Sequence, residues 1–200
     1  MYAGDATRQR LLRAAIELFT TSGYHTTTTP QIARRARLAE GTIYRHFEGK
    51  QALLNELYRG AVQWATAQVE AAPAHAVTPP EQLDEVARAL VSCAARDPAV
   101  IRMALLIRHG DLLDDRSRDA EGQLHQALAR LVAGGKADGT VRVGSAELWG
   151  GVWLSVVRHA LERVCAGEWA EGHPAVAHVT AAAWRAIAAG PPPAESQHVD

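Results

Sequence analysis

Apolar residues recur every three or four positions along most of this chain, which is the spacing of one face of an α-helix. Residues 7–19 show this spacing first, with Ile16 and Phe19 among the apolar positions. Gly23 follows in a place suited to the left-handed turn past a helix end. The alternation of apolar and polar residues that marks a β-strand extends over no useful length. The pattern therefore predicts an all-α protein.

The pattern over residues 28–47 predicts two short amphipathic helices joined by a tight turn. The first would bury Ile32 and Ala36, and the second would bury Ile43 and Phe47. Four residues of the second helix then face outward and offer hydroxyl, guanidinium and imidazole groups to phosphate oxygens and base edges in a DNA major groove. They are Thr42, Tyr44, Arg45 and His46. We interpret the segment as a helix-turn-helix that binds double-stranded DNA; the alternative is a plain pair of surface helices.

A larger set of positions agrees in order and spacing with one family. The residues that carry the agreement are Ala14, Ala15, Phe19, Gly23, Tyr24, Thr28, Thr29, Ile32, Ala33, Ala36, Gly41, Thr42, Ile43, Tyr44, His46, Phe47, Lys50, Leu53 and Leu54. On these positions, residues 7–58 resemble the N-terminal DNA-binding domain of the tetracycline-repressor (TetR) family of bacterial regulators. The resemblance implies an N-terminal three-helix helix-turn-helix domain joined to a C-terminal helical bundle that binds a ligand and dimerises.

The resemblance also implies which residues contact DNA. Thr28 or Thr29 and Gln31 would approach the DNA backbone, Gly41, Thr42 and Arg45 would enter the groove, and Tyr44, His46 and Lys50 would contact phosphates. Lys50 begins the next predicted helix, where unpaired N–H groups and the helix dipole also favour an anion. For Tyr44 and His46 the alternative is packing on the domain surface.

Two positions depart from the family's pattern. Arg37 occupies a turn position that is usually Gly, so either a non-glycine residue adopts positive φ or the turn differs. Ala39 stands where a hydroxyl usually caps the recognition helix, which removes a contribution of about 1 kcal/mol. The next residue, Glu40, could accept a hydrogen bond from a cytosine amino group or simply stabilise the helix N-terminus.

The charges of the chain are unevenly distributed. Residues 1–60 hold nine Lys and Arg against five Asp and Glu, whereas residues 61–200 hold twelve against seventeen. A basic N-terminal part attracts the phosphate backbone without regard to its sequence. This distribution agrees with DNA binding by the N-terminal part.

The remaining sequence predicts a second helical domain. Residues 72–80 interrupt the helix that starts at Lys50, and Thr78 with Glu81 forms a capping box for the next helix. Asp97-Pro98 starts a further helix, residues 111–118 are polar and predicted to be a loop, and residues 120–132 are helical again. We expect residues 1–60 to bind DNA, residues 61–190 to bind an effector and dimerise, and residues 191–200 to be disordered.

The last two predicted helices suggest a homodimer. The helix capped by Ser145 has more than one apolar stripe, so it must bury two faces, and residues 174–189 are small and apolar. Gly150-Gly151 would permit close helix approach. We expect residues 145–189 to form the dimer interface, because a helix-turn-helix needs a partner to read a palindromic operator. The alternative is one self-contained bundle core.

The resemblance further implies a cavity in the second domain whose small-molecule ligand weakens DNA binding. The candidate lining residues are an apolar and aromatic set with a few polar groups: Trp64, Met103, Leu106, His109, Leu124, His125, Leu128, Trp149 and Trp153. The alternative for each of them is ordinary core packing.

Other classes of function lack support in the sequence. Paired carboxylates with His spacing, Gly-rich phosphate loops and nucleophile motifs are missing, so we expect no enzyme and no cofactor. Neither His109, His125, His159 nor His178 shares an i, i+4 face with another, so we expect no metal. With two cysteines, no signal peptide and no membrane span, we expect a cytoplasmic protein. The sequence predicts a repressor released by a small apolar or aromatic effector. The alternatives are a DNA-binding or interaction protein without an effector, or an all-helical enzyme.

Overall fold

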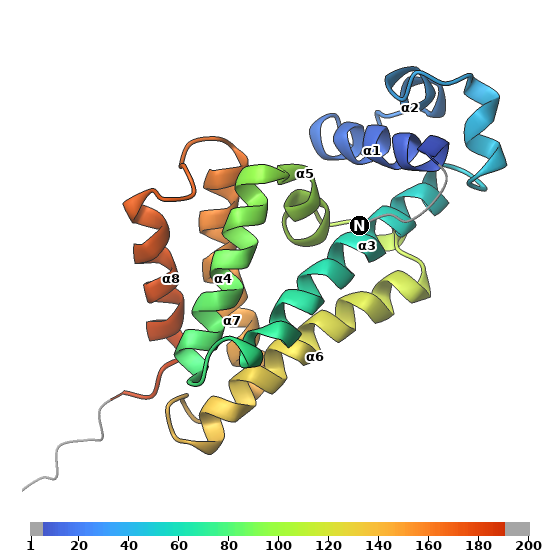
Figure 1. The fold of residues 1–200 in the computed structure, drawn as a ribbon. Helices are drawn as coiled ribbons and strands as arrows, with labels where there is room; N and C mark the ends of the chain where they lie inside the picture. Colours follow the sequence, from blue (N-terminus) through green and yellow to red (C-terminus); the bar gives the residue numbers. More distant parts are fainter. Residues whose placement is uncertain (1–5, 191–200) are drawn as a thin grey trace, which may run out of the picture.

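Helices joined by short turns make up residues 6–190, the part of the chain that the computed structural model describes (Figure 1). The elements are α1 (Ala6–Thr21), α2 (Thr29–Arg35), η1 (Glu40–Arg45), α3 (Lys50–Ala71), η2 (Ala72–Ala74), α4 (Pro79–Arg96), α5 (Pro98–Ile101), η3 (Arg102–Leu106), η4 (Gly110–Leu112), α6 (Asp115–Ala137), α7 (Ala146–Cys165) and α8 (Pro174–Ile187). Within this range the only strand-like pairing is one isolated bridge between Val141 and Ala188. The all-α prediction is confirmed, and the tail expected at residues 191–200 lies outside the described residues.

The helices form a small head, which consists of α1, α2 and η1, and a larger body, which contains α4 to α8. Figure 1 shows α1, α2 and η1 grouped at one end of α3, while α4, α7 and α8 stand at the other end and α6 lies alongside α3. Helix α3 passes through residue 60, where the sequence analysis placed the domain boundary. One continuous cluster of buried side chains also runs from Leu11 and Phe19 in the head to Trp153 in the body. Head and body are therefore joined by a shared helix and a shared core.

The buried faces of the head agree with the apolar pattern. Ile32, Ala36, Ile43 and Phe47 are all buried. Thr28 caps α2 as half of a capping box, since its backbone N–H donates to Gln31 Oε1 at 2.8 Å. The second helix of the pair differs from expectation, because η1 is a 3-10 helix and not an α-helix. Ala39 precedes it without a side-chain cap, as the sequence indicated.

The turn between α2 and η1 places Arg37 at φ +56°, in the left-handed region. The backbone therefore keeps the conformation that glycine would favour, with an arginine in the glycine position. Arg10 on α1 supports the turn by donating to the carbonyl oxygens of Ala36 at 2.5 Å and Arg37 at 2.9 Å.

Replacing Arg37 by Gly should stabilise the head. The left-handed conformation costs a non-glycine residue about 1 to 2 kcal/mol, and the greater freedom of unfolded glycine offsets about half of that gain. We expect the unfolding free energy in urea to rise by about 0.5 to 1 kcal/mol. Arg34→Gly, a change inside helical α2, is the matched control and should destabilise by up to about 1 kcal/mol. Equal signs for the two variants would contradict this account.

The connection before α6 differs from the predicted loop over residues 111–118. Helix α6 begins at Asp115, because the Asp114 carboxylate accepts from the backbone N–H of Ser117 at 2.8 Å. Buried Asn55 of α3 fixes this start: its Nδ2 donates to the Leu112 carbonyl at 2.9 Å, and its Oδ1 accepts from the Asp114 N–H at 2.8 Å. The polar sequence predicted a loop here. The prediction missed the helix start because the hydrogen-bond partner Asn55 lies on α3, far away in the sequence.

The other end of α6 continues through Gly134 and Gly135 to Ala137, beyond the predicted end near residue 132. A Cβ at Gly135 would lie 2.7 Å from Val141 Cγ2, so glycine here permits close approach of the following segment. The predicted capping of α7 is present, since Leu148 N–H donates to Ser145 Oγ at 3.1 Å. Cys93 and Cys165 are free and buried, and burial raises the pKa of each thiol to about 11.

Charged side chains connect α2 to the body through α1. Arg35 of α2 pairs with Glu17 Oε2 at 2.6 Å, and Arg13 Nε donates to Glu17 Oε1 at 2.9 Å. Arg13 Nη1 in turn donates to Asp97 Oδ2, between α4 and α5, at 2.6 Å. Exposed ion pairs of this kind add little stability. They nevertheless tie the orientation of the helix-turn-helix to the α4–α5 junction.

Candidate nucleic-acid interface

The N-terminus of α2 and the end of η1 meet through two hydroxyls. Thr29 Oγ1 lies 3.0 Å from the Tyr44 hydroxyl, within hydrogen-bonding distance. Tyr44 is 59% exposed, which is unusual for a large aromatic residue. The side chains of Thr28 and Gln31 are exposed beside this pair, although the Gln31 carbonyl oxygen is occupied by the cap of α2. These four residues form a polar group at one corner of the head.

The exposed side of η1 carries the residues expected to read base edges. Glu40, Gly41 and Arg45 are exposed, and Thr42 is half-buried. Arg45 makes no ion pair with any residue between 6 and 190, so its guanidinium is available to a partner. A side chain on Gly41 would meet no other atom within 4 Å, so the backbone is open to close approach here. The geometry suits the contacts that the resemblance implies for this face.

Lys50 has a structural role that the sequence analysis did not foresee. Its Nζ donates to the carbonyl oxygens of Tyr24 and Thr27, each at 2.8 Å, and lies 4.2 Å from the centroid of the Tyr24 ring. Two of its three N–H donors therefore hold the segment that leads into α2. The phosphate contact of Lys50 stays a prediction, and it would use the remaining donor. His46 is half-buried, with its ring centroid 6.5 Å from that of Phe47.

A cavity of about 630 Å³ lies in the body, away from the helix-turn-helix. Of the candidate effector residues, Leu106, His109 and His125 line it, together with residues from α3, α6 and α7. The other candidates lie elsewhere. Met103, Leu124, Leu128 and Trp153 are buried in the core, while Trp64 and Trp149 are half-buried and pack against it. Trp149 Nε1 donates to the Val143 carbonyl at 3.1 Å.

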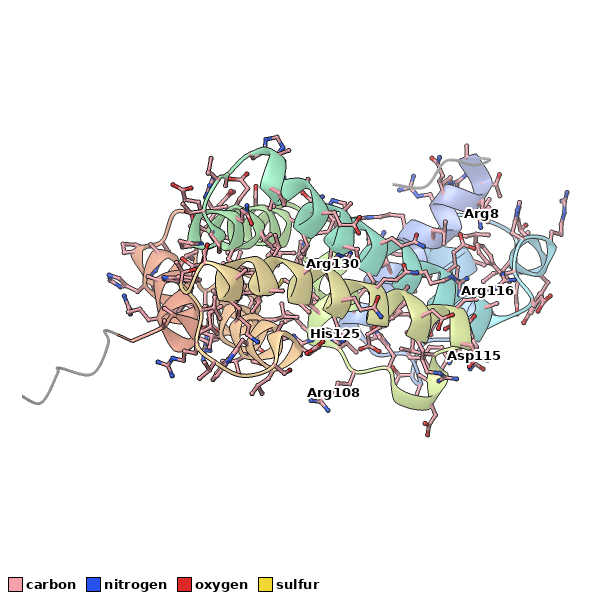
Figure 2. All side chains as sticks on the ribbon, turned by 90° about the horizontal axis from the view of Figure 1, so that it is seen from below. Arg8, Arg108, Asp115, Arg116, His125 and Arg130 are labelled. Carbon is pink, nitrogen blue, oxygen red and sulfur yellow. The ribbon has the colours of Figure 1, made fainter. Side chains whose placement is uncertain are left out.

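The cavity wall includes more charged groups than the apolar set expected from the sequence. Arginines and glutamates from α6, α7 and the segment after η3 contribute to it: Arg108, Arg118, Glu121, Arg158 and Glu162. Figure 2 shows His125 on α6 and Arg108 pointing outward from the segment after η3. Sequence reasoning missed these residues because surface arginines and glutamates are common on helices and carry no spacing signal of their own.

Two buried rings form the inner end of the cavity. The rings of Tyr58 and His109 meet edge to face with centroids 5.2 Å apart, and His109 Nε2 donates to the Met103 carbonyl at 3.1 Å. Burial, helped by the charge of Glu121 and a hydrogen bond to its carboxylate, raises the pKa of Tyr58, and the charge of Arg158 opposes that shift. Burial lowers the pKa of His109, although its bond to Met103 and the charge of Glu121 oppose that shift.

The buried imidazole predicts a pH dependence of stability. Unfolded His109 takes up a proton below about pH 6.5, whereas the folded ring stays neutral to lower pH. The free energy of unfolding should therefore fall as pH decreases through 6.5, by up to about 1.4 kcal/mol per pH unit. His109→Gln, which keeps a donor for the Met103 carbonyl, should reduce this fall when urea unfolding is compared at neutral and mildly acidic pH. His178→Gln, at an exposed ring, is the control; an equal pH dependence in parent and His109→Gln would refute the assignment.

Comparison with known proteins agrees with the helix-turn-helix geometry. Residues 11–57 match the family model described as bacterial regulatory proteins, tetR family. The uncharacterised regulator YvkB of Bacillus subtilis is 45% identical over 51 residues, which are 26% of this chain and 27% of that protein. The regulator TcmR of Streptomyces glaucescens is 30% identical over 129 residues, which are 63% of this chain and 47% of that protein. The matches to these two curated relatives thus cover less than half of either one's length.

Similarity to a solved structure extends over nearly the whole chain. A tetR-family regulator from Shewanella sp. PV-4 superposes with a TM-score of 0.74 at 25% identity, covering 93% of this chain and all of that one. A helix-turn-helix head on a helical body defines this class of bacterial regulators. Residues 11–57 of this chain match the tetR family of bacterial regulatory proteins, and the fold of the chain is similar to that of a solved tetR-family regulator. Among residues 6–190, the structure contains no helix long and apolar enough to cross a membrane.

Proposed function

We propose that this protein is a cytoplasmic repressor that binds a palindromic operator as a homodimer and releases it when a small molecule enters the body. The observation that carries the DNA-binding part is the pair of exposed side chains Tyr44 and Arg45 on the helix-turn-helix, with half-buried Thr29 within hydrogen-bonding distance of Tyr44. Hydroxyl groups hydrogen-bond to phosphate oxygens and so position a protein on the DNA backbone. A guanidinium without an ion pair can donate to the hydrogen-bond acceptors on the major-groove edge of guanine. The charge excess of residues 1–60 supports the same assignment.

Selection of bound sequences from a random DNA pool tests this proposal. We expect a two-fold symmetric consensus whose half-sites are about one helical turn apart. Band shifts with the selected site and with a shuffled site then measure specificity at a stated salt concentration. A pool that yields no consensus would overturn the operator-binding role.

The dimer proposal is supported by apolar side chains on the outer side of α7. Leu148 is 56% exposed, and Val152 and Val156, near it along the helix, are half-buried. Val179 on α8 is also half-buried. A row of large apolar side chains that remains partly exposed in one chain favours burial against a second copy. Residues 145–189 remain our proposed interface.

The two adjacent glycines of α7, Gly150 and Gly151, have different surroundings. A Cβ on Gly150 would lie 3.5 Å from Leu128 Cβ, so Gly150 faces α6 of its own chain. A Cβ on Gly151 would meet nothing within 4 Å. Only the second glycine is therefore open to a partner helix.

Effector release is supported by the position of the cavity relative to the head. Ile107, Arg108 and His109 line both the body cavity and a second cavity of about 680 Å³ that is also lined by residues 19–25 of the head. A ligand that displaces residues 107–109 would thus alter contacts near α1. A tenfold loss of operator affinity requires about 1.4 kcal/mol of ligand preference for the released form.

A further inference from the structure

Arg158 is a charged group in the wall of the body cavity that contains a buried donor without a partner. Its Nε is buried without a hydrogen-bond partner, and no ion pair joins Arg158 to any residue of the described chain, 6–190. Two other charged groups in the wall do have partners. Glu121 is hydrogen-bonded to the Tyr58 hydroxyl, and Arg118 pairs with Asp115 at 3.1 Å. The cavity therefore contains one guanidinium whose inner N–H has no acceptor.

A buried donor without an acceptor is costly and rare in folded proteins. The Nε–H of a guanidinium and a neighbouring Nη–H point in parallel and match the two oxygens of a carboxylate. Nε of Arg158 is itself covered by protein atoms, so a ligand in the cavity that Arg158 lines would reach the guanidinium through its terminal Nη groups. A carboxylate in the cavity would accept from these Nη donors and neutralise the charge of the guanidinium.

The rest of the wall accommodates an apolar group. Ala104, Leu105 and Leu113 are buried, and Leu106 and Ile107 beside them also line the cavity. Its volume of about 630 Å³ lies within the range of about 300 to 1,000 Å³ that is usual for small-molecule sites. The site thus combines an apolar surface with one anion-binding side chain.

We propose that the ligand of this cavity is a small organic acid whose carboxylate binds Arg158 and whose apolar part lies on the leucines of the η3 segment. Calling this acid an effector rests on the function proposed above, whereas its binding to the cavity does not. Three arginines against two glutamates in the wall favour an anion over a cation. An acidic group is thereby added to the small apolar or aromatic effector expected from the sequence.

Calorimetric titration of the DNA-free protein tests the proposal. The probes are octanoate and benzoate, with octanamide and benzamide as neutral matches of the same size. We expect saturable binding of at least one acid at millimolar concentration, at least tenfold tighter than its amide. Arg158→Gln should weaken binding of that acid at least tenfold and leave the amide unchanged. Arg116→Gln, an exposed α6 arginine outside the cavity wall, should bind the acid like the parent.

A second variant guards against a folding defect in Arg158→Gln. Glu121→Gln removes a negative charge from the wall while retaining an acceptor for the Tyr58 hydroxyl, and it should strengthen acid binding. The proposal is overturned if neither acid binds, if the amides bind equally well, or if a folded Arg158→Gln binds like the parent. A band shift with the bound acid is a separate measurement: if the acid binds through Arg158 but leaves operator affinity unchanged, the binding site stands and effector release fails.

Discussion

Leu148→Glu should convert the protein from a dimer to a monomer and abolish operator binding at concentrations where the parent binds. The side chain is 56% exposed in one chain, so a single chain tolerates a charge there. In the proposed interface each glutamate would lose its water without gaining a counter-ion, at a cost of several kcal/mol. The dimer dissociation constant should therefore rise about 100-fold or more, as measured by analytical ultracentrifugation.

Val77→Glu is the matched control for this variant. Val77 is 90% exposed in the turn before α4, outside residues 145–189. It receives the same charge and should leave both the dimer and operator binding intact. Circular dichroism of the Leu148→Glu monomer should show the parent's helix content. A parent protein that is monomeric at micromolar concentration, or a Leu148→Glu protein that remains dimeric, would refute the interface.

Arg45→Ala should weaken operator binding and also relax its specificity. The guanidinium is exposed on η1 without an ion pair in the described chain, so it loses little on binding a base edge. A bidentate contact to guanine discriminates by about 1 to 3 kcal/mol, which corresponds to a loss of roughly 5- to 150-fold for the preferred base. Band shifts on operators that vary one base pair at a time would find the position whose preference disappears.

Two further variants distinguish recognition of a base by Arg45 from two other effects: the loss of a positive charge and the loss of stability of the fold. Arg130→Ala removes an equal charge from α6, breaks only an exposed pair with Glu70, and should bind operator nearly as the parent does. Lys50→Ala should weaken binding to all sequences alike, with a salt slope lower by about one unit if its third donor contacts a phosphate. Since Lys50 also holds two carbonyls before α2, this variant should in addition lower the stability of the head. Unchanged specificity in Arg45→Ala would show that η1 does not enter the groove as proposed.

Local sequence was enough to predict the helices and most of the head. The 3.6-residue period shows which face of a segment is apolar, so burial of Ile32, Ile43 and Phe47 could be predicted without knowing what covers them. Caps are local too, which is why Thr78 and Ser145 were recognised as helix starts. The sequence shows an arginine, Arg37, in a position that is usually glycine. Only the structure shows that Arg37 adopts positive φ there and that the turn does not change.

Only the tertiary structure decided how polar side chains from distant segments combine. The start of α6 depends on Asn55, which lies about sixty residues earlier in the sequence. Lys50, which follows the helix-turn-helix, donates to backbone carbonyls of the segment that precedes it. The cavity brings Tyr58, Glu121 and Arg158 together from three helices, and no spacing within any one helix reveals that meeting. The physical reason is that periodicity records the hydrophobic face of a helix, whereas the contacts made by its polar residues depend on how that helix packs against the others.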